Sequence, residues 1–150
     1  MDHIALQKVD ESNFIPCFAL KLHGWQEKFV SHPIRSLAQA YVYYKQCTPF
    51  AVCLDGQVVG YVMVIYDYDE ETYNIWHLMI DKAHQGKGYG RAAMELALAY
   101  IRTKPFGRSG RVLLTLNPDN RAACNLYRAL GFSKTGRRDE DEVELGLTLD

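Results

Sequence analysis

The chain has 150 residues, of which 48% are hydrophobic and 23% are charged, and its formal net charge at pH 7 is -1. These values predict a single globular domain over residues 1–150 and argue against a disordered or fibrous protein. The balanced charge also argues against nucleic acid as the main partner, because neutralising phosphates requires a clear excess of lysine and arginine.

Residues 1–10 lack the basic start and apolar run of a secretory signal, and no stretch reaches the roughly 18 apolar residues that a membrane span requires. We therefore expect a cytoplasmic protein with no membrane partner. The cysteines have no CxxC spacing, which favours reduced, mostly buried thiols over a metal site or a disulfide framework. They are Cys17, Cys47, Cys53 and Cys124.

Hydrophobic periodicity predicts a strand, two helices and three antiparallel strands in the first half of the chain. Asp55-Gly56 is a strong signal for a tight hairpin turn, and Pro33 is expected to lie in the break between the two helices. The expected strands are residues 4–9, 50–54, 58–66 and 73–80, and the expected helices are residues 14–22 and 36–44.

The second half alternates helices and strands. Apolar residues recur with helical spacing from Ala93 to Ile101 and again from Ala123 to Leu130, where Gly131 closes the helix. Strands are expected at residues 112–116, 132–135 and 142–149. The order predicts an α/β fold with a mixed central sheet of about seven strands and helices on both faces.

Three glycines, Gly86, Gly88 and Gly90, lie between a predicted strand and the next helix. Glycine permits positive φ and a close backbone approach, and the helix start offers unpaired N–H groups, so such a loop suits a pyrophosphate. A dinucleotide fingerprint would need glycine at Arg91, and a P-loop would need Ser or Thr after Lys87. Taken alone, the loop could equally be a tight turn that binds nothing.

Gln85, Gly88 and Gly90 match the signature of the GNAT acyltransferases, which is Gln or Arg, two residues, Gly, one residue, then Gly or Ala. A second segment, residues 117–132, is similar to another motif of that family. The chain resembles the family in element order over roughly its whole length. The second motif matches at Asn117, Asn120, Ala123, Tyr127, Gly131 and Phe132.

This resemblance implies the GNAT-type acyl-CoA N-acyltransferase fold, acetyl-CoA as co-substrate, no metal, and a possible homodimer. It implies that Tyr127 protonates the leaving thiolate as the catalytic acid. From the residues alone, Asn120 is also a good helix N-cap and Tyr127 a good core aromatic. The implied cofactor-binding residues are Leu78, Met79, Ile80, Gln85, Gly86, Lys87, Gly88, Tyr89, Gly90, Arg91, Asn117, Asn120 and Tyr127.

The implied reaction is direct attack of an amine on the acetyl carbonyl, with a strand N–H near Met79 holding the oxyanion. Relatives that use a strand glutamate place it at positions corresponding to Asn74 or Trp76, neither of which is acidic here. Strand alternation predicts that His77 faces away from Trp76 and Leu78, which favours a structural role. Ordered water is then the expected base.

Residues 25–40 and 78–90 look like the corresponding regions of bacterial spermine/spermidine acetyltransferases. This implies a small-molecule amine acceptor, a polyamine, bound by Glu27 and Trp76. Trp25, Tyr66 and the acidic turn at residues 67–71 are expected to add to the acceptor groove. The alternatives are another amine, such as an aminoglycoside, an amino acid or a peptide N-terminus, or a non-catalytic acyl-CoA-binding module.

Overall fold

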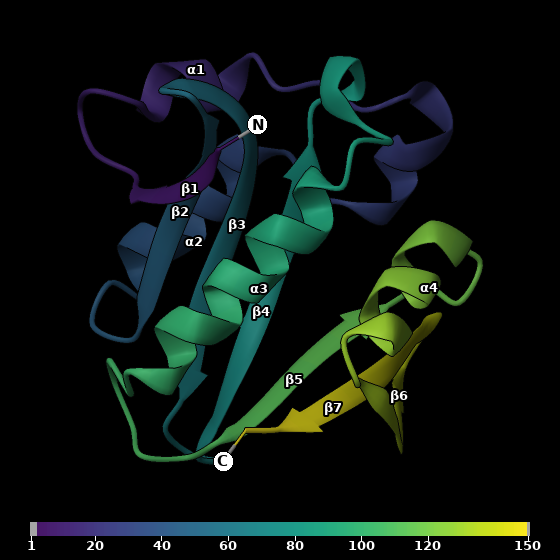
Figure 1. Ribbon diagram of the computed structural model, residues 1–150. Coiled ribbons are helices and arrows are strands. Elements are labelled where there is room, and N and C mark those ends of the chain that lie inside the picture. The colour runs from purple at the N-terminus through teal and green to yellow at the C-terminus, as the bar shows by residue number, and fades with distance from the viewer. Residues whose placement is uncertain (1–2, 150) are drawn as a thin grey trace.

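The computed structural model describes residues 3–149, and Figure 1 shows a central sheet with helices on both faces. The strands are β1 (Ile4–Lys8), β2 (Cys47–Leu54), β3 (Gln57–Asp67), β4 (Thr72–Ile80), β5 (Arg111–Leu116), β6 (Ser133–Asp139) and β7 (Glu142–Thr148). The α-helices are α1 (Phe14–Phe18), α2 (Pro33–Val42), α3 (Tyr89–Arg102) and α4 (Arg121–Ala129), and two short 3₁₀ helices are η1 (Gly24–Phe29) and η2 (Lys82–His84).

The seven strands form one mixed sheet in the order β1-β2-β3-β4-β5-β7-β6. Within residues 3–149, only the β4–β5 pair is parallel, and the other neighbours are antiparallel. One apolar core lies under α3 and α4, and a second lies under α1 and α2 on the opposite face. The predicted α/β fold with about seven strands is confirmed.

The parallel pair holds together over a short distance only. β4 and β5 pair at Tyr73 with Val112 and at Asn74 with Leu113, and Figure 1 shows the two strands diverging beyond this point. β5 continues beside β7 as far as Leu116. The second half of β4 therefore has a backbone edge that no strand in the described part of the chain covers.

A β-bulge interrupts the same half of β4. Val62 of β3 faces two residues, His77 and Leu78, and His77 has a φ angle of 62°. An extra residue shifts the alternation of the strand, so His77 and Trp76 both lie on the α2 side, whereas Leu78 packs on the α3 side. The prediction that His77 faces away from Trp76 is wrong, because alternation assumes an unbroken ladder.

The helices before β2 also differ from the expected ranges. Pro33 does not separate the helices but begins α2, where its missing N–H costs nothing. The ring of His32 accepts the N–H of Ile34 at 3.1 Å and caps the helix. Helix α1 ends at Phe18, four residues before the predicted end, and η1 was not predicted.

Three cysteines, Cys17, Cys47 and Cys53, are free and buried, as expected, and burial raises the pKa of each thiol. Cys124 is also free but only half-buried. Within residues 3–149, no helix is long and apolar enough to cross a membrane. The cytoplasmic location and the homodimer stay predictions.

The side chain of Gln85 fastens the loop between β4 and α3. Its Nε2 donates to the carbonyl oxygen of Ile80, the last residue of β4, at 2.9 Å. Its amide also pairs reciprocally with Gln26 of η1, since each Nε2 donates to the other Oε1 at 2.9 Å. The glycine loop and η1 are thus held at the same end of β4.

The Gln26–Gln85 amide pair should contribute to the free energy of unfolding. Gln85→Ala and Gln26→Ala should each lower the free energy of unfolding by about 1 kcal/mol, because each removes part-buried hydrogen bonds. The double variant should lose less than the sum, since both changes remove the same pair. Urea denaturation of the parent and the three variants measures the coupling.

Gln57→Ala serves as the control, because Gln57 is an exposed glutamine at the start of β3. Its effect should stay within about 0.5 kcal/mol. Strict additivity of the Gln85 and Gln26 substitutions would contradict the reciprocal pair.

Candidate functional site

The glycine loop exposes its backbone through two left-handed residues. Gly86 and Gly88 have φ angles of 78° and 83°, and a Cβ built on either would meet no atom within 4 Å. Gly88 directly precedes α3, whose first turn leaves N–H groups without acceptors inside the helix and carries the positive end of the helix dipole. The open space and these donors fit a phosphate group.

A hollow of about 410 Å³ adjoins this loop and is lined in part by Lys87, Gly88 and Tyr89. Arg91, also predicted to bind the cofactor, forms an exposed ion pair with Glu95 at 2.9 Å. Lys87 is exposed and forms no ion pair within residues 3–149. Lys87 is therefore the cation of the loop that is available to an anionic ligand.

Gly90 brings three elements together. A Cβ built on Gly90 would lie 3.8 Å from a side-chain carbon of Ile80 in β4 and 3.8 Å from one of Leu126 in α4. The end of β4, the start of α3 and the middle of α4 therefore meet at this glycine. Tyr127, the residue after Leu126, lies on α4 beside this junction.

Tyr127 is half-buried and packs edge-on against Phe132, with ring centroids 6.0 Å apart. Its hydroxyl makes no hydrogen bond to any residue within 3–149, and burial, followed by the neighbouring Cys124, raises its pKa to about 12. The phenol therefore stays protonated at neutral pH. It is a proton donor without a partner in the described part of the chain.

The other residues of the second motif shape α4. Asn120 caps the helix by accepting the N–H of Ala123 at 3.4 Å. Gly131, with a φ angle of 99°, lets the chain turn back so that the N–H of Phe132 donates to the carbonyl of Tyr127 at 3.0 Å. The predicted capping roles of Asn120 and Gly131 are confirmed, and they fix where Tyr127 lies.

Asn117 lies directly after β5 and has a local role as well. Its Oδ1 accepts the N–H of Asp119 at 2.9 Å, and its carbonyl accepts the N–H of Asn120 at 2.9 Å. The acceptor atoms of both motif asparagines thus organise the turn between β5 and α4. This turn directs α4 back toward the glycine loop.

Two backbone amides of β4 point toward its open edge. The N–H of Asp81 donates to Val59 of β3 at 2.8 Å. Because successive amides of a strand alternate between its edges, the N–H groups of Leu78 and Ile80 point to the side where β5 has diverged. These two residues flank Met79, so their backbone donors lie near the place predicted for the oxyanion contact.

Glu27 and Trp25, on the predicted acceptor side, both belong to η1. Glu27 is exposed, and Trp25 is 62% exposed and stacks on the ring of His23. Trp76 is half-buried against the core under α1 and α2. The Gln26 pair connects η1 to the glycine loop, so Glu27 lies close in sequence to a residue that is fixed there.

Tyr66 and the acidic turn do not belong to this site. Tyr66 is 4% exposed and packs against Tyr73 in the core on the α3 side, which overturns its expected place in the acceptor groove. Glu70 is bound by Arg137 through two hydrogen bonds of 3.0 Å. The turn lies at the start of β4, roughly 25 Å from the glycine loop at its far end.

His77 belongs to a buried polar cluster that the sequence did not reveal. Its Nδ1 lies 2.7 Å from Ser36 Oγ, which in turn lies 2.7 Å from the hydroxyl of Tyr61. Burial, followed by the charge of Arg35, lowers the pKa of His77 to about 4. The imidazole is therefore neutral at pH 7.

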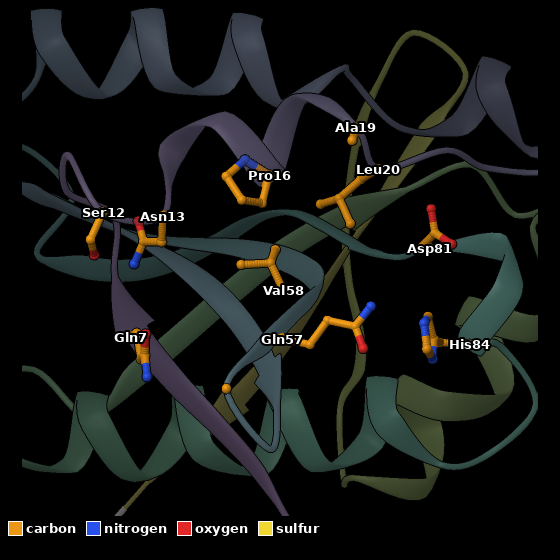
Figure 2. Close-up of a pocket in the computed structure, with 11 residues that line it drawn as sticks. Gln7, Ser12, Asn13, Pro16, Ala19, Leu20, Gln57, Val58, Asp81 and His84 are labelled. Carbon is orange, nitrogen blue, oxygen red and sulfur yellow. The ribbon is translucent and has the colours of Figure 1, made fainter.

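Figure 2 shows a second hollow, of about 550 Å³, between α1, the β2–β3 turn and η2. None of the predicted site residues lines it. Its Asp81 carboxylate accepts the N–H of Lys21 at 2.8 Å and that of Ala83 at 3.0 Å, and its Asn13 accepts the N–H of Asp10 at 2.9 Å. These polar side chains hold the surrounding loops in place.

Known proteins resemble this chain in sequence. A probable spermine N(1)-acetyltransferase of Bacillus subtilis subsp. natto is 30% identical over 103 residues, which cover 65% of this chain and 64% of that protein. N-alpha-acetyltransferase RimI of Mycobacterium tuberculosis is 38% identical over 85 residues, which cover 55% of this chain and 50% of that protein. The chain thus spans 64% and 50% of the lengths of these curated relatives.

Solved structures share the fold. A domain from Methanocaldococcus jannaschii superposes with a TM-score of 0.79 at 18% identity over 99% of this chain and 100% of that one. Spermidine N-acetyltransferase from Vibrio cholerae, in complex with CoA and spermine, gives 0.73 at 20% identity over 97% of this chain and 95% of that one. The model of the acetyltransferase (GNAT) family matches residues 15–132, so the chain belongs to this family.

Proposed function

We propose that this chain transfers the acetyl group of acetyl-CoA to a primary amine of a polyamine such as spermidine or spermine. The observation that carries the proposal is the junction at Gly90, where the end of β4, the start of α3 and Leu126 of α4, the neighbour of the protonated Tyr127, come together. A family of acetyltransferases and relatives named for polyamine acetylation support it.

In this proposal the loop holds the pyrophosphate. The amides around Gly86, Gly88 and Gly90 and the dipole of α3 favour the anion, and Lys87 adds a positive charge. The pantetheine arm follows the open edge of β4. Gln85 contributes by fixing the loop, because its side-chain amide is already bonded to Ile80 and Gln26.

The chemistry is acyl transfer in a ternary complex. The amine nitrogen attacks the acetyl carbonyl, and the N–H of Leu78 or Ile80 holds the oxyanion that develops. As the intermediate collapses, Tyr127 donates its phenolic proton to the departing thiolate, which a pKa of about 12 permits because the group is protonated beforehand. No acyl-enzyme is required.

The acceptor approaches from η1. The exposed carboxylate of Glu27 attracts a polycation, and the exposed ring of Trp25 offers a face for a cation–π contact. The second candidate acceptor is a peptide N-terminus, which the 38% identity to a protein named N-alpha-acetyltransferase favours. An N-terminal amine does not need an acidic groove for a second charge.

The first prediction from this mechanism concerns Tyr127. Tyr127→Phe removes the hydroxyl but keeps the ring that packs on Phe132. We expect kcat to fall about 100-fold, because general acid catalysis is lost, while the Kd for acetyl-CoA stays unchanged. Thiol release and isothermal titration measure the two quantities, and an unchanged kcat would remove Tyr127 as the acid.

The second prediction concerns the loop. Gly88→Glu places a side chain and a negative charge in the space proposed for the pyrophosphate, and acetyl-CoA binding should be lost. Gly56→Glu is the matched control, because Gly56 also has a positive φ angle, of 88°, and open surroundings but lies in the β2–β3 turn. Equal acetyl-CoA affinity in both variants would contradict the proposed loop site.

The acceptor is tested by a panel of polyamines, aminoglycosides, amino acids and peptides, followed as thiol release. We expect the highest kcat/KM with spermidine or spermine. Glu27→Gln should raise KM for the polyamine several-fold, since a charge contact worth about 1 kcal/mol is lost, with little change in kcat. Turnover with peptides but not polyamines would instead support the N-terminal acceptor.

A further inference from the structure

An amine acceptor must give up a proton during acetyl transfer, and β4 offers one titratable side chain at the place where this would happen. Asn74 and Trp76, on the α2 side of the strand, have no basic group. His77 lies on the same side because of the bulge. It follows Trp76 and directly precedes Leu78, whose amide points to the open edge of β4.

The two ring nitrogens of His77 have different surroundings. Nδ1 is anchored 2.7 Å from Ser36 Oγ. Nε2 has no hydrogen-bond partner within residues 3–149, and this atom is not completely buried. The imidazole is therefore fixed at one nitrogen and accessible at the other, which is the arrangement that a base requires.

We propose that Nε2 of His77 takes the proton that the acceptor amine loses when its nitrogen bonds to the acetyl carbon. This role rests on the acetyl transfer proposed above and adds a catalytic residue to it. His77 replaces, in function, the acidic side chain that is missing from positions 74 and 76.

Ser36 allows the ring to accept this proton. For Nε2 to carry a free electron pair, Nδ1–H must donate to Ser36 Oγ, which can also accept the hydroxyl proton of Tyr61. The serine proton then points to the sulfur of Met63, 3.9 Å away. No strong donor of the cluster is left without an acceptor in this tautomer, and the same bonds hold once the imidazolium forms.

The charges around His77 set when the proton can move. Desolvation of the ring and then the charge of Arg35 of α2 lower the pKa of His77 to about 4, and the Tyr61 phenol from β3 stays neutral because burial raises its pKa. A lysine-like ammonium has a pKa of about 10.4, so His77 does not deprotonate the free ammonium. It acts on the far more acidic nitrogen that has already bonded to carbon.

The acceptor enters the step as the neutral amine, its ammonium proton having passed to water. The nitrogen lone pair forms the C–N bond and the carbonyl π pair moves to oxygen. When that pair returns, the C–S bond breaks and its electrons leave with sulfur, which receives the proton of Tyr127. The N–H proton passes to His77 Nε2. Water then takes this proton from the imidazolium, helped by repulsion from Arg35, and returns one to the Tyr127 phenolate.

Two variants of His77 separate this role from a structural one. His77→Asn keeps a side-chain amide for Ser36 and a residue type that tolerates the φ angle of 62°, but it has no base. We expect kcat to fall about 100-fold with an unchanged Kd for acetyl-CoA. A kcat within about twofold of the parent would overturn the proposal, since loss of a base costs far more.

His77→Gly also accepts the positive φ angle and leaves room for free imidazole. Added imidazole should raise its kcat about tenfold by supplying the missing base, and it should leave Tyr127→Phe unchanged. Failure of imidazole to raise the rate would overturn the base role while the parent activity stands. A parent that acetylates no amine in the panel would overturn the proposed function itself and this inference with it.

Discussion

The separation of β4 from β5 is the constraint on which the rest of this site depends. In a continuous sheet, the neighbouring strands take up all backbone hydrogen bonds of an inner strand. A ligand therefore cannot hydrogen-bond to the backbone of such a strand. Here β4 and β5 pair at two positions only within the described residues, Tyr73 with Val112 and Asn74 with Leu113. β4 stays paired with β3 on one side and exposes the backbone amides of Leu78 and Ile80 on the other. The apolar cores on the two faces of the sheet hold β4 and β5 in place where they no longer pair.

The bulge at His77 adds a second consequence at the same place. It directs His77 toward α2 without disturbing the pairing of Met79 with Tyr61 further along. The left-handed φ of His77 is sparsely populated for a residue other than glycine or asparagine. Its persistence here is consistent with the anchor at Ser36, because the hydrogen bond and the burial of Tyr61 stabilise the turned-in ring.

Sequence reasoning predicted the parts of this site that local backbone chemistry controls. Gly88 and Gly131 adopt the positive φ angles that their positions required, and Asn120 caps α4 as a short polar side chain before a helix should. Local rules predict local structure well because each depends on only a few neighbouring residues.

The features that were missed depend on contacts between distant segments. Nothing in the sequence near Gln85 indicates that its amide pairs with Gln26, 59 positions away. The face of His77 depended on a bulge that strand alternation ignores. The residue type of Tyr66 favours a place in the groove, whereas its position in β3 places it in the core on the α3 side. A proline at position 33 suggests a break between helices, but proline also suits the first helical position, which Pro33 occupies in α2.

In the proposed mechanism, the two faces of the sheet supply the acid and the base. Tyr127 packs with the core on the α3 and α4 side, and His77 contacts α2 on the other. Burial raises the pKa of the phenol to about 12 and lowers that of the imidazole to about 4. Both groups are therefore neutral over the whole physiological range, one carrying a proton to give and the other an electron pair to receive one. The proposed mechanism places the thioester in the gap between β4 and β5, between these two side chains.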